Sequence, residues 1–310
     1  MARKIALAGI GKIARDQHIP SIAASGDWEL AATITRHDGV DGVENYTDIG
    51  EMLEARRDIE VVSLCLPPVP RFEYAAAASK AGRHVMLETP PGATLAECHT
   101  LEAMSREAGV SIFATWHSRE AASVEAARIW LAGKTLKRLK ITWLEDVRRW
   151  HPGQAWIWEP GGLGVFDPGI NALSILTRIL PVPVHLTGAT LKFPENRQTP
   201  IAADLAFRHP DGADVSAAFD WRKDGDQFWN IEAETNGGTM VLADGGARLS
   251  IDGAAIEASG DALAGEYPRL YAQMAELVRA GGIDMDLSPM VHVADAFLLG
   301  ARETVEPFDE

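Results

Sequence analysis

The chain of 310 residues is poor in cysteine, in positive charge and in long apolar runs. Cys65 and Cys98 are its only cysteines, too few and too far apart for a disulfide scaffold or a zinc ligand set, so we expect no metal site. Its 29 basic against 44 acidic side chains give a net charge of −15, which argues against nucleic acid or an anionic membrane surface as a partner. No run approaches the roughly 18 apolar residues of a membrane span.

The N-terminus superficially resembles a signal peptide, because Arg3 and Lys4 precede the apolar residues 5–8. That run stops at Gly9, so we expect no targeting signal and a cytoplasmic location. Hydrophobic residues make up 46% of the chain and charged ones 24%, which is typical of folded proteins. The length exceeds that of one usual domain and predicts either two domains or one large α/β domain.

The first part of the chain alternates between short apolar runs and helical patterns. Strands are predicted at residues 4–8, 29–35, 61–66, 84–87 and 110–115. Helices are predicted between them at residues 10–24, 47–57, 72–81 and 95–107. This order predicts an α/β domain over residues 1–119, a doubly wound parallel sheet of the Rossmann type. Ligands of such sheets bind at the carboxyl ends of the strands.

The pattern changes after residue 119. A helix is predicted at 123–131, followed by alternating segments at 138–145, 184–193, 201–207, 215–221, 228–234, 238–243 and 247–251. Turn signals at 209–212 and 236–238 are typical of antiparallel hairpins. We therefore expect a substrate-binding α+β domain over residues 120–310 with a large mixed or antiparallel sheet. Two helices, at 266–280 and 288–303, end the chain, and they can pack either there or back on the first domain.

A glycine motif directly follows the first predicted strand. Gly9, Gly11 and Ala14 form the pattern G-x-G-x-x-A, with Lys12 and Ile13 inside it. Its glycines permit a tight turn and let backbone amides approach a pyrophosphate at the helix N-terminus. An ordinary strand-to-helix turn is the alternative. The position in a βαβ unit favours dinucleotide binding.

The end of the second predicted strand bears on the choice of cofactor. Selectivity for NAD normally places Asp or Glu there, whereas this chain has Thr35, Arg36 and His37. A guanidinium and a hydroxyl can accept a 2′-phosphate, so we expect NADP to be tolerated or preferred, with NAD as the other cofactor. A solvated loop charge remains the alternative for Arg36.

Three further strand ends carry candidate residues. Consecutive prolines begin at Pro67, directly after the segment with Cys65, and such irregular backbone can line the nicotinamide side of a site. Cys65 itself is more typical of a packed thiol than of a nucleophile. Glu88 is a candidate for the nicotinamide ribose or for substrate positioning. His117 follows the last strand of the domain, although a lone histidine is usually structural.

The densest region lies between residues 143 and 171. Six of the nine tryptophans fall between Trp116 and Trp158, among carboxylates and imidazoles. Indole faces stack on sugar C–H faces while polar groups bind the hydroxyls, but a tryptophan-rich core or subunit interface explains the composition equally well. Asp167 can act as a helix N-cap, or share one helix face with Asn171. Together they can bind a hydroxyl and accept its proton.

In this order the motifs resemble the Gfo/Idh/MocA family, and within it the branch of aldose 1-dehydrogenases. The resemblance spans essentially the whole chain and is carried by residues 9–18, 84–88, 113–118, 145–153 and 156–171. It implies NAD(P)-dependent oxidation at C1 of an aldopyranose such as D-galactose, L-arabinose or D-fucose, with the lactone as product. It also implies that the sugar pocket contains His117, Glu145, Trp150 and His151.

Two positions depart from the family pattern. Most members carry Glu-Lys-Pro where this chain has Glu88-Thr89-Pro90, and the family lysine is assigned to the substrate hydroxyl. Thr89 supplies a hydrogen bond without positive charge, so we expect binding with slow turnover. Asn171 stands where many members have histidine, which makes Asp167 the strongest base candidate.

The sequence leaves two other functions open. A non-catalytic sensor of sugar and dinucleotide would explain Thr89, and a polyol or inositol dehydrogenase would keep the chemistry but change the substrate. In the mechanism we favour, Asp167 accepts the anomeric proton while Asn171 and Thr89 hold O1. A large exposed sheet face also makes a homodimer possible.

Overall fold

The computed structural model describes residues 2–257 and 265–309. These residues form two compact units. The first contains the described residues of Met1–His117 and Leu263–Leu287, and the second contains those of Ser118–Ala262 and Ser288–Glu310. The chain therefore leaves the first unit and returns to it for one helix before it ends in the second.

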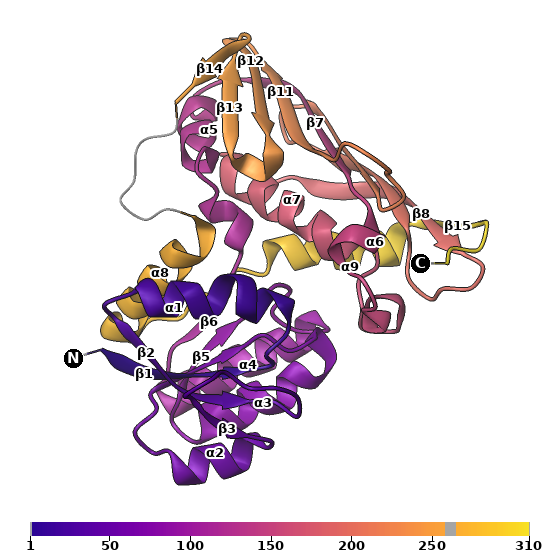
Figure 1. The fold of residues 1–310 in the computed structure, drawn as a ribbon. Helices are drawn as coiled ribbons and strands as arrows, with labels where there is room; N and C mark the ends of the chain where they lie inside the picture. Colours follow the sequence, from indigo (N-terminus) through magenta and orange to yellow (C-terminus); the bar gives the residue numbers. More distant parts are fainter. Residues whose placement is uncertain (1, 258–264, 310) are drawn as a thin grey trace. The chain divides into compact units, whose positions relative to one another are not determined.

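Within its described residues, the first unit contains a six-stranded sheet in the order β3-β2-β1-β4-β5-β6, in which every neighbouring pair is parallel. Its strands are β1 (Arg3–Ala8), β2 (Trp28–Ile34), β3 (Glu44–Tyr46), β4 (Val61–Leu64), β5 (His84–Leu87) and β6 (Ile112–Ala114). Its helices are α1 (Ile19–Ala24), α2 (Ile49–Ala55), α3 (Pro68–Lys80), α4 (Leu95–Ala108) and α8 (Glu266–Ala280) (Figure 1). This strand order is that of the dinucleotide-binding Rossmann fold, so the predicted fold class is confirmed.

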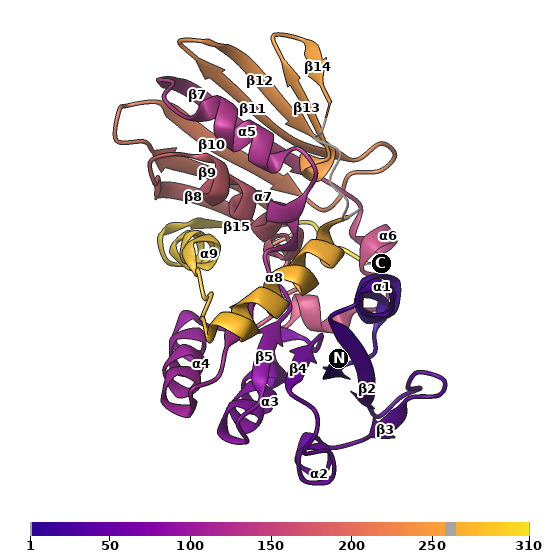
Figure 2. The same cartoon turned by 90° about the vertical axis from the view of Figure 1, so that its left-hand side faces the viewer.

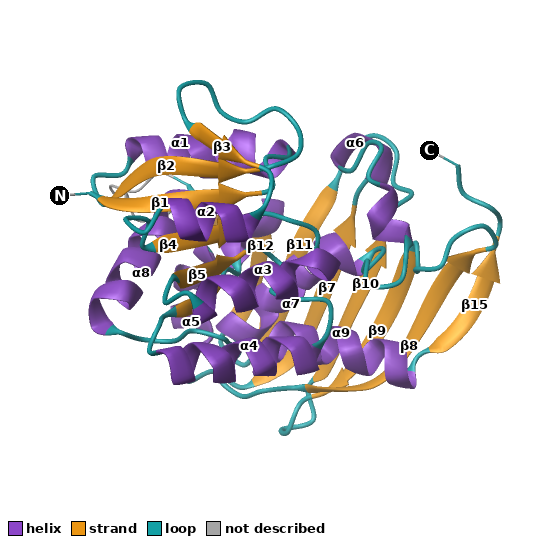
Figure 3. Ribbon diagram, turned by 90° about the horizontal axis from the view of Figure 1, so that it is seen from below, coloured by secondary structure: helices purple, strands orange, loops and turns teal. Residues whose placement is uncertain are grey.

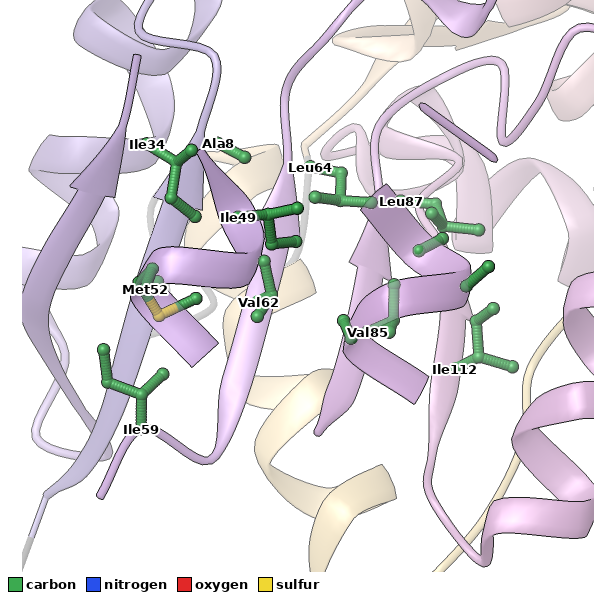
Figure 4. Close-up of a cluster of buried hydrophobic side chains, with 14 of the residues drawn as sticks. Ala8, Ile34, Ile49, Met52, Ile59, Val62, Leu64, Val85, Leu87 and Ile112 are labelled. Carbon is green, nitrogen blue, oxygen red and sulfur yellow. The ribbon is translucent and has the colours of Figure 1, made fainter. Parts of the chain in front are cut away.

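Helices cover both faces of this parallel sheet, as its almost wholly apolar strands require. On one face, Ile34, Val62 and Leu87 pack among apolar side chains that include Ile49 and Met52 of α2 (Figure 4). On the other face, the buried side chains of α8 pack with those of β1 and with Trp28 of β2. A helix some 150 residues away in the sequence thus completes the core of the first unit.

Within its described residues, the second unit contains a nine-stranded mixed sheet in the order β14-β13-β12-β11-β7-β10-β9-β8-β15. Its strands are β7 (Leu136–Leu144), β8 (His185–Pro194), β9 (Ala202–Arg208), β10 (Asp214–Asp220), β11 (Phe228–Thr235), β12 (Gly238–Ala243), β13 (Arg248–Ile251), β14 (Ala254–Ile256) and β15 (Ala301–Val305). Its helices are α5 (Val124–Leu131), α6 (Val147–Trp150), α7 (Phe166–Ile179) and α9 (Ser288–Leu299). α5, α7 and α9 lie side by side on one face of the sheet (Figures 2 and 3).

The structure corrects the sequence-based prediction at several places. The helix predicted at 288–303 is wrong beyond Leu299, because the chain turns at Gly300 and residues 301–305 form β15, which pairs in parallel with β8. The helix predicted at 10–24 begins two residues later, at Lys12, and passes through a π-helical turn over Ala14–His18 into α1. Two three-residue strands, β3 and β14, are too short for an alternating pattern to reveal.

Across the part of the chain that the structure covers, the helices are too short or too polar for a membrane span.

Candidate functional site

The glycine motif forms a tight loop after β1. Gly9 has φ +85°, and a Cβ there would stand 3.0 Å from the backbone nitrogen of Leu66, so only glycine fits. A Cβ added to Gly11 would meet nothing within 4 Å, so the backbone is open to a ligand at that point. Ile13 is exposed, and Lys12 forms an ion pair with Asp16. The loop is thus packed on one side and open on the other, as a pyrophosphate cradle must be.

The end of β2 presents one buried and two exposed polar residues. The Thr35 hydroxyl accepts a hydrogen bond from the His37 N–H at 3.1 Å, and the Thr35 N–H donates to the Tyr46 carbonyl at 2.9 Å. Thr35 is buried, whereas Arg36 and His37 are exposed. Thr35 therefore shapes the turn, and Arg36 is the cation that this turn exposes.

A buried arginine joins two strand-end loops. The Arg71 guanidinium donates to the carbonyl of Leu66 at 3.1 Å and also to those of Glu88 and Pro90. Pro67 is the residue before α3, in the same loop as Leu66. Arg71 was not predicted as a site residue, since an arginine inside a helical pattern is typical of a solvated side chain. Its contacts hold the prolyl segments after β4 and β5 in one arrangement.

Glu88 lies at the centre of a buried hydrogen-bond network. Oε1 accepts from the Tyr267 hydroxyl at 2.7 Å and lies 3.1 Å from Nε2 of His18, while Oε2 accepts from the Thr89 N–H at 2.6 Å. Burial would raise the pKa of Glu88, but the hydrogen bonds and the charge of His18 outweigh it and lower the pKa to about 2. Glu88 is thus an ionised carboxylate, and both of its oxygens already accept hydrogen bonds. Tyr267 could not be predicted as a partner of Glu88, because the two residues lie far apart in the sequence.

His18 is the cationic side of this network. Its Nδ1 lies 2.8 Å from the Tyr271 hydroxyl, and its ring packs edge-on against Tyr267. Burial lowers the pKa of His18, but interactions with Cys65, Tyr271 and Glu88 outweigh burial and raise it well above the ordinary value. Cys65 is half-buried, and its thiol interacts with the buried imidazole of His18.

Thr89 and His117 stand at neighbouring strand ends. The Thr89 hydroxyl donates to the carbonyl of Thr115, and the Thr89–Pro90 bond is cis. His117 Nδ1 lies 2.6 Å from Oε2 of Glu266, and its ring stacks on Tyr267 with centroids 5.6 Å apart. Burial lowers the pKa of His117, but the charge and hydrogen bond of Glu266 outweigh it, so the pKa is raised. His117 therefore belongs to the first unit, with its partners on α8.

In the second unit, Glu145 holds two tryptophans. Oε1 accepts from the Trp221 indole at 3.0 Å and Oε2 from the Trp229 indole at 2.9 Å. Glu145 is only 5% exposed, and this burial raises the pKa of its carboxyl group in spite of the two indole donors. The Trp150 indole donates to Gln227 at 3.4 Å, and the rings of Trp150 and Trp229 are tilted against each other with centroids 5.4 Å apart. Trp221 and Trp229 were missed because they lie outside the tryptophan-rich segment.

Asp167, His151 and Asn171 come together at the start of α7. His151 Nε2 lies 3.5 Å from Oδ2 of Asp167, and the imidazole packs against Trp221 at 5.3 Å. The N-cap interpretation of Asp167 is wrong, because Val165 is the N-cap and Asp167 is the second residue of the helix. Among the described residues, no donor bonds Oδ1 of Asn171, although this atom is buried. A buried acceptor left without a donor costs about 1–3 kcal/mol.

Comparison with known proteins fits this geometry. The family described as an oxidoreductase family with a NAD-binding Rossmann fold, Gfo/Idh/MocA, matches residues 3–115. The chain is 42% identical over 317 residues to galactose 1-dehydrogenase of Pseudomonas fluorescens, covering 98% of both proteins.

Solved structures point the same way. A D-galactose-1-dehydrogenase from Rhizobium etli has a TM-score of 0.94 and 56% identity, and the match covers 100% of this chain and 99% of that one. KijD10, a 3-ketoreductase from Actinomadura kijaniata solved with NADP and TDP-benzene, shares the fold with a TM-score of 0.84 at 17% identity, covering 98% of this chain and all of that one. The fold and the glycine loop define an oxidoreductase with a NAD-binding Rossmann unit. The chain belongs to the Gfo/Idh/MocA family.

Proposed function

We propose that the protein oxidises an aldopyranose of the D-galactose type at C1 to the lactone, with NADP+ or NAD+ as hydride acceptor. The observation that carries this proposal is the group on the first turns of α7, where Asp167 lies beside His151 and Asn171 keeps a buried acceptor without a donor. Such a pair can act on a sugar, because Asn171 can bind a hydroxyl group while Asp167 accepts a proton from the hydroxyl that is oxidised. The relatives at 42% and 56% identity, both galactose dehydrogenases, support the substrate class.

The first unit would hold the dinucleotide. The open backbone at Gly11 fits the pyrophosphate, with Lys12 and Ile13 beside it, and exposed Arg36 fits a 2′-phosphate next to the turn of Thr35 and His37. A nicotinamide bound here would supply the acceptor for the hydride of C1. Its side of the site would be built by Cys65, Pro67 and Glu88. In this site Glu88 would act as an ionised carboxylate whose position is fixed by His18 and Tyr267.

The second unit would hold the sugar. Asp167 accepts the proton of the anomeric hydroxyl, and His151 keeps the Asp167 carboxylate in place. Asn171 Oδ1 accepts a hydrogen bond from a sugar hydroxyl, which supplies the donor it lacks. The indole faces of Trp150 and Trp229 suit the C–H face of the ring. In this proposal Glu145 acts through Trp221 and Trp229, which it holds with both carboxylate oxygens.

Thr89 makes the proposal directly testable. Its hydroxyl is engaged by the Thr115 carbonyl and carries no charge, so a lysine there would add a cation for the developing alkoxide. We expect Thr89→Lys to raise kcat with D-galactose and NADP+ by about a hundredfold or more, with little change in sugar affinity. The measurement is absorbance in the reduced-nicotinamide band, with the lactone identified as product.

Two results would contradict the proposal. If neither the wild-type protein nor Thr89→Lys turns over while both bind galactose and NADP+ in calorimetry, a sugar and dinucleotide sensor is the better function, and Thr89 is the feature that favours it. A product other than the lactone would instead indicate a polyol or another alcohol as substrate.

Two finer properties belong to the same proposal. We place the enzyme in the cytoplasm, where its cofactor is kept and where the free thiols of Cys65 and Cys98 stay reduced.

We also propose a homodimer through the face of the nine-stranded sheet opposite α5, α7 and α9, because a sheet this large has a second face to cover. Sedimentation of a monomer at micromolar concentration would rule the dimer out.

A further inference from the structure

We propose that His117 and Glu266 form an imidazolium–carboxylate pair that supplies, in the first unit, the positive charge that Thr89 does not. Glu266 is the positioning residue of the pair, and His117 carries the charge. This inference rests on the proposed function, because the charge matters only if O1 of a sugar becomes an alkoxide during oxidation.

The contacts of His117 define the pair. Nδ1 lies 2.6 Å from Oε2 of Glu266, a short distance typical of a charge-assisted hydrogen bond. The side chains of His117 and Glu266 are 22% and 30% exposed, so the pair is partly shielded from water. The Tyr267 ring, parallel to the imidazole within 20°, fixes the plane in which the ring lies.

The position of His117 relates it to Thr89. The Thr89 hydroxyl donates to the Thr115 carbonyl, two residues before His117, so the ends of β5 and β6 are joined at this point. Tyr267 connects the same two places, because its ring stacks on His117 and its hydroxyl donates to Glu88, the neighbour of Thr89. The imidazole thus stands at the strand end next to Thr89, held there by α8.

The surrounding charges favour a protonated His117. Glu266 faces it from α8, Glu88 acts on it from the end of β5, and His18 opposes it from the π-helical turn. The Tyr267 phenol remains neutral, since burial raises its pKa well above the ordinary value. Among the described residues named here, the carboxylates of Glu266 and Glu88 face the imidazoles of His117 and His18. Removing the charge of Glu266 takes away the larger of the two favourable charges and keeps the opposing charge of His18, which disfavours the second proton of His117.

The test uses the full-length protein with Glu266→Gln, which preserves size and removes the charge. We expect the His117 titration midpoint, followed by NMR of labelled histidine and assigned with His117→Gln, to move to lower pH. We expect kcat/KM for D-galactose to fall by about tenfold to a hundredfold at a pH between the two measured midpoints, where only wild-type His117 is protonated, and by much less at a pH below both midpoints. The affinity for NADP+ should not change.

Two variants control the experiment. Glu276→Gln removes a carboxylate from an exposed position of the same helix and should change neither quantity. Glu266→Asp keeps the charge and should restore most of the pH profile, which a merely structural role of Glu266 would not predict. The inference is overturned if Glu266→Gln leaves the His117 midpoint in place, or if its loss of kcat/KM is the same between the two midpoints as below both.

The outcomes also separate this inference from the proposed function. If the wild-type protein oxidises no aldose, the proposed function fails, and a charge supplied for oxidation fails with it. If the wild-type protein does oxidise galactose but the loss of kcat/KM in Glu266→Gln does not depend on pH, the proposed function stands. Only the inference about the His117–Glu266 pair is then wrong.

Discussion

Individual side chains in both units are held by partners far away in the sequence. Glu88 is fixed by Tyr267, 179 residues later, and Glu145 by Trp229, 84 residues later. In each case a buried carboxylate accepts hydrogen bonds from aromatic donors, which satisfies the carboxylate and fixes the aromatic ring. The residues best suited to touch ligands, such as Asp167 and His117, are themselves held by a second titratable group.

Asp167 is the residue on which turnover should depend most strongly. Asp167→Asn keeps the volume of the side chain and removes the base, so we expect kcat with galactose to fall by about 10²- to 10⁴-fold. The dissociation constant of NADP+ should stay within a factor of about two, because Asp167 lies in the second unit. Initial rates and fluorescence titration of the cofactor measure the two quantities.

Asp214→Asn is the matched control, since it makes the same change at an exposed position of β10. Wild-type activity in Asp167→Asn would show that another group accepts the proton. If kcat falls equally in both aspartate variants, the change in net charge explains the loss, and Asp167 is not the base.

At the scale of elements, α7 carries the candidate chemistry because of how closely it packs on the sheet. Gly169 lies between Asp167 and Asn171, and a Cβ at Gly169 would stand 2.8 Å from the Phe219 ring on β10. Phe219 in turn packs edge-on against Phe166 at 5.9 Å. The small residue therefore lets the helix approach the strand, and this contact sets the position of the two polar side chains.

Gly169→Ala tests that packing. Alanine in a helix gains about 1 kcal/mol over glycine, but the clash with a buried aromatic ring should dominate and destabilise the protein by about 1–3 kcal/mol. We also expect a higher KM for galactose than for the wild type, with the KM for NADP+ unchanged. Chemical denaturation and steady-state kinetics provide the two readouts.

The control is Gly188→Ala in β8, where an added Cβ meets nothing within 4 Å, so the free energy of unfolding should change by less than about 0.5 kcal/mol. If Gly169→Ala is as stable as this control, α7 is not constrained by Phe219.

Most elements could be predicted from the sequence because their signals are local. The strands at 84–87 and 238–243 and the helix at 266–280 agree with β5, β12 and α8 at both ends. The helical pattern of α9 hid β15, whose strand conformation depends on pairing with β8 more than 100 residues earlier. The same reason explains the site. Motifs next to strand ends could be recognised, whereas Glu266, Tyr267 and Trp229 have roles only through long-range contacts.

At the scale of the whole molecule, the first unit is discontinuous in sequence. Six side chains of α8 are buried, and Tyr271 accepts a hydrogen bond from the Trp28 indole at its carbonyl, at 2.9 Å. Residues beyond α8 also join the sheet, because Asp284 forms a parallel bridge with Phe113 of β6. Burial of each large apolar side chain contributes about 1.5–3 kcal/mol, and the stability of a domain is only about 5–15 kcal/mol. The first unit therefore needs α8.

This leads to a prediction about fragments. Residues 2–117 alone should lack a cooperative unfolding transition, bind a hydrophobic dye and show no measurable affinity for NADP+, because the faces of β1 and Trp28 lose their cover. The same residues joined to 265–287 by a flexible linker of about six residues should fold cooperatively and bind NADP+. A linker of that length spans about 13 Å, which suffices because His117 and Glu266 are in side-chain contact. Calorimetry with NADP+ and circular dichroism on heating measure both fragments.

Cooperative unfolding and full NADP+ affinity in residues 2–117 alone would mean that α8 only covers a unit that is already stable. The buried network of Tyr267 and Tyr271 would then serve the reaction more than the fold.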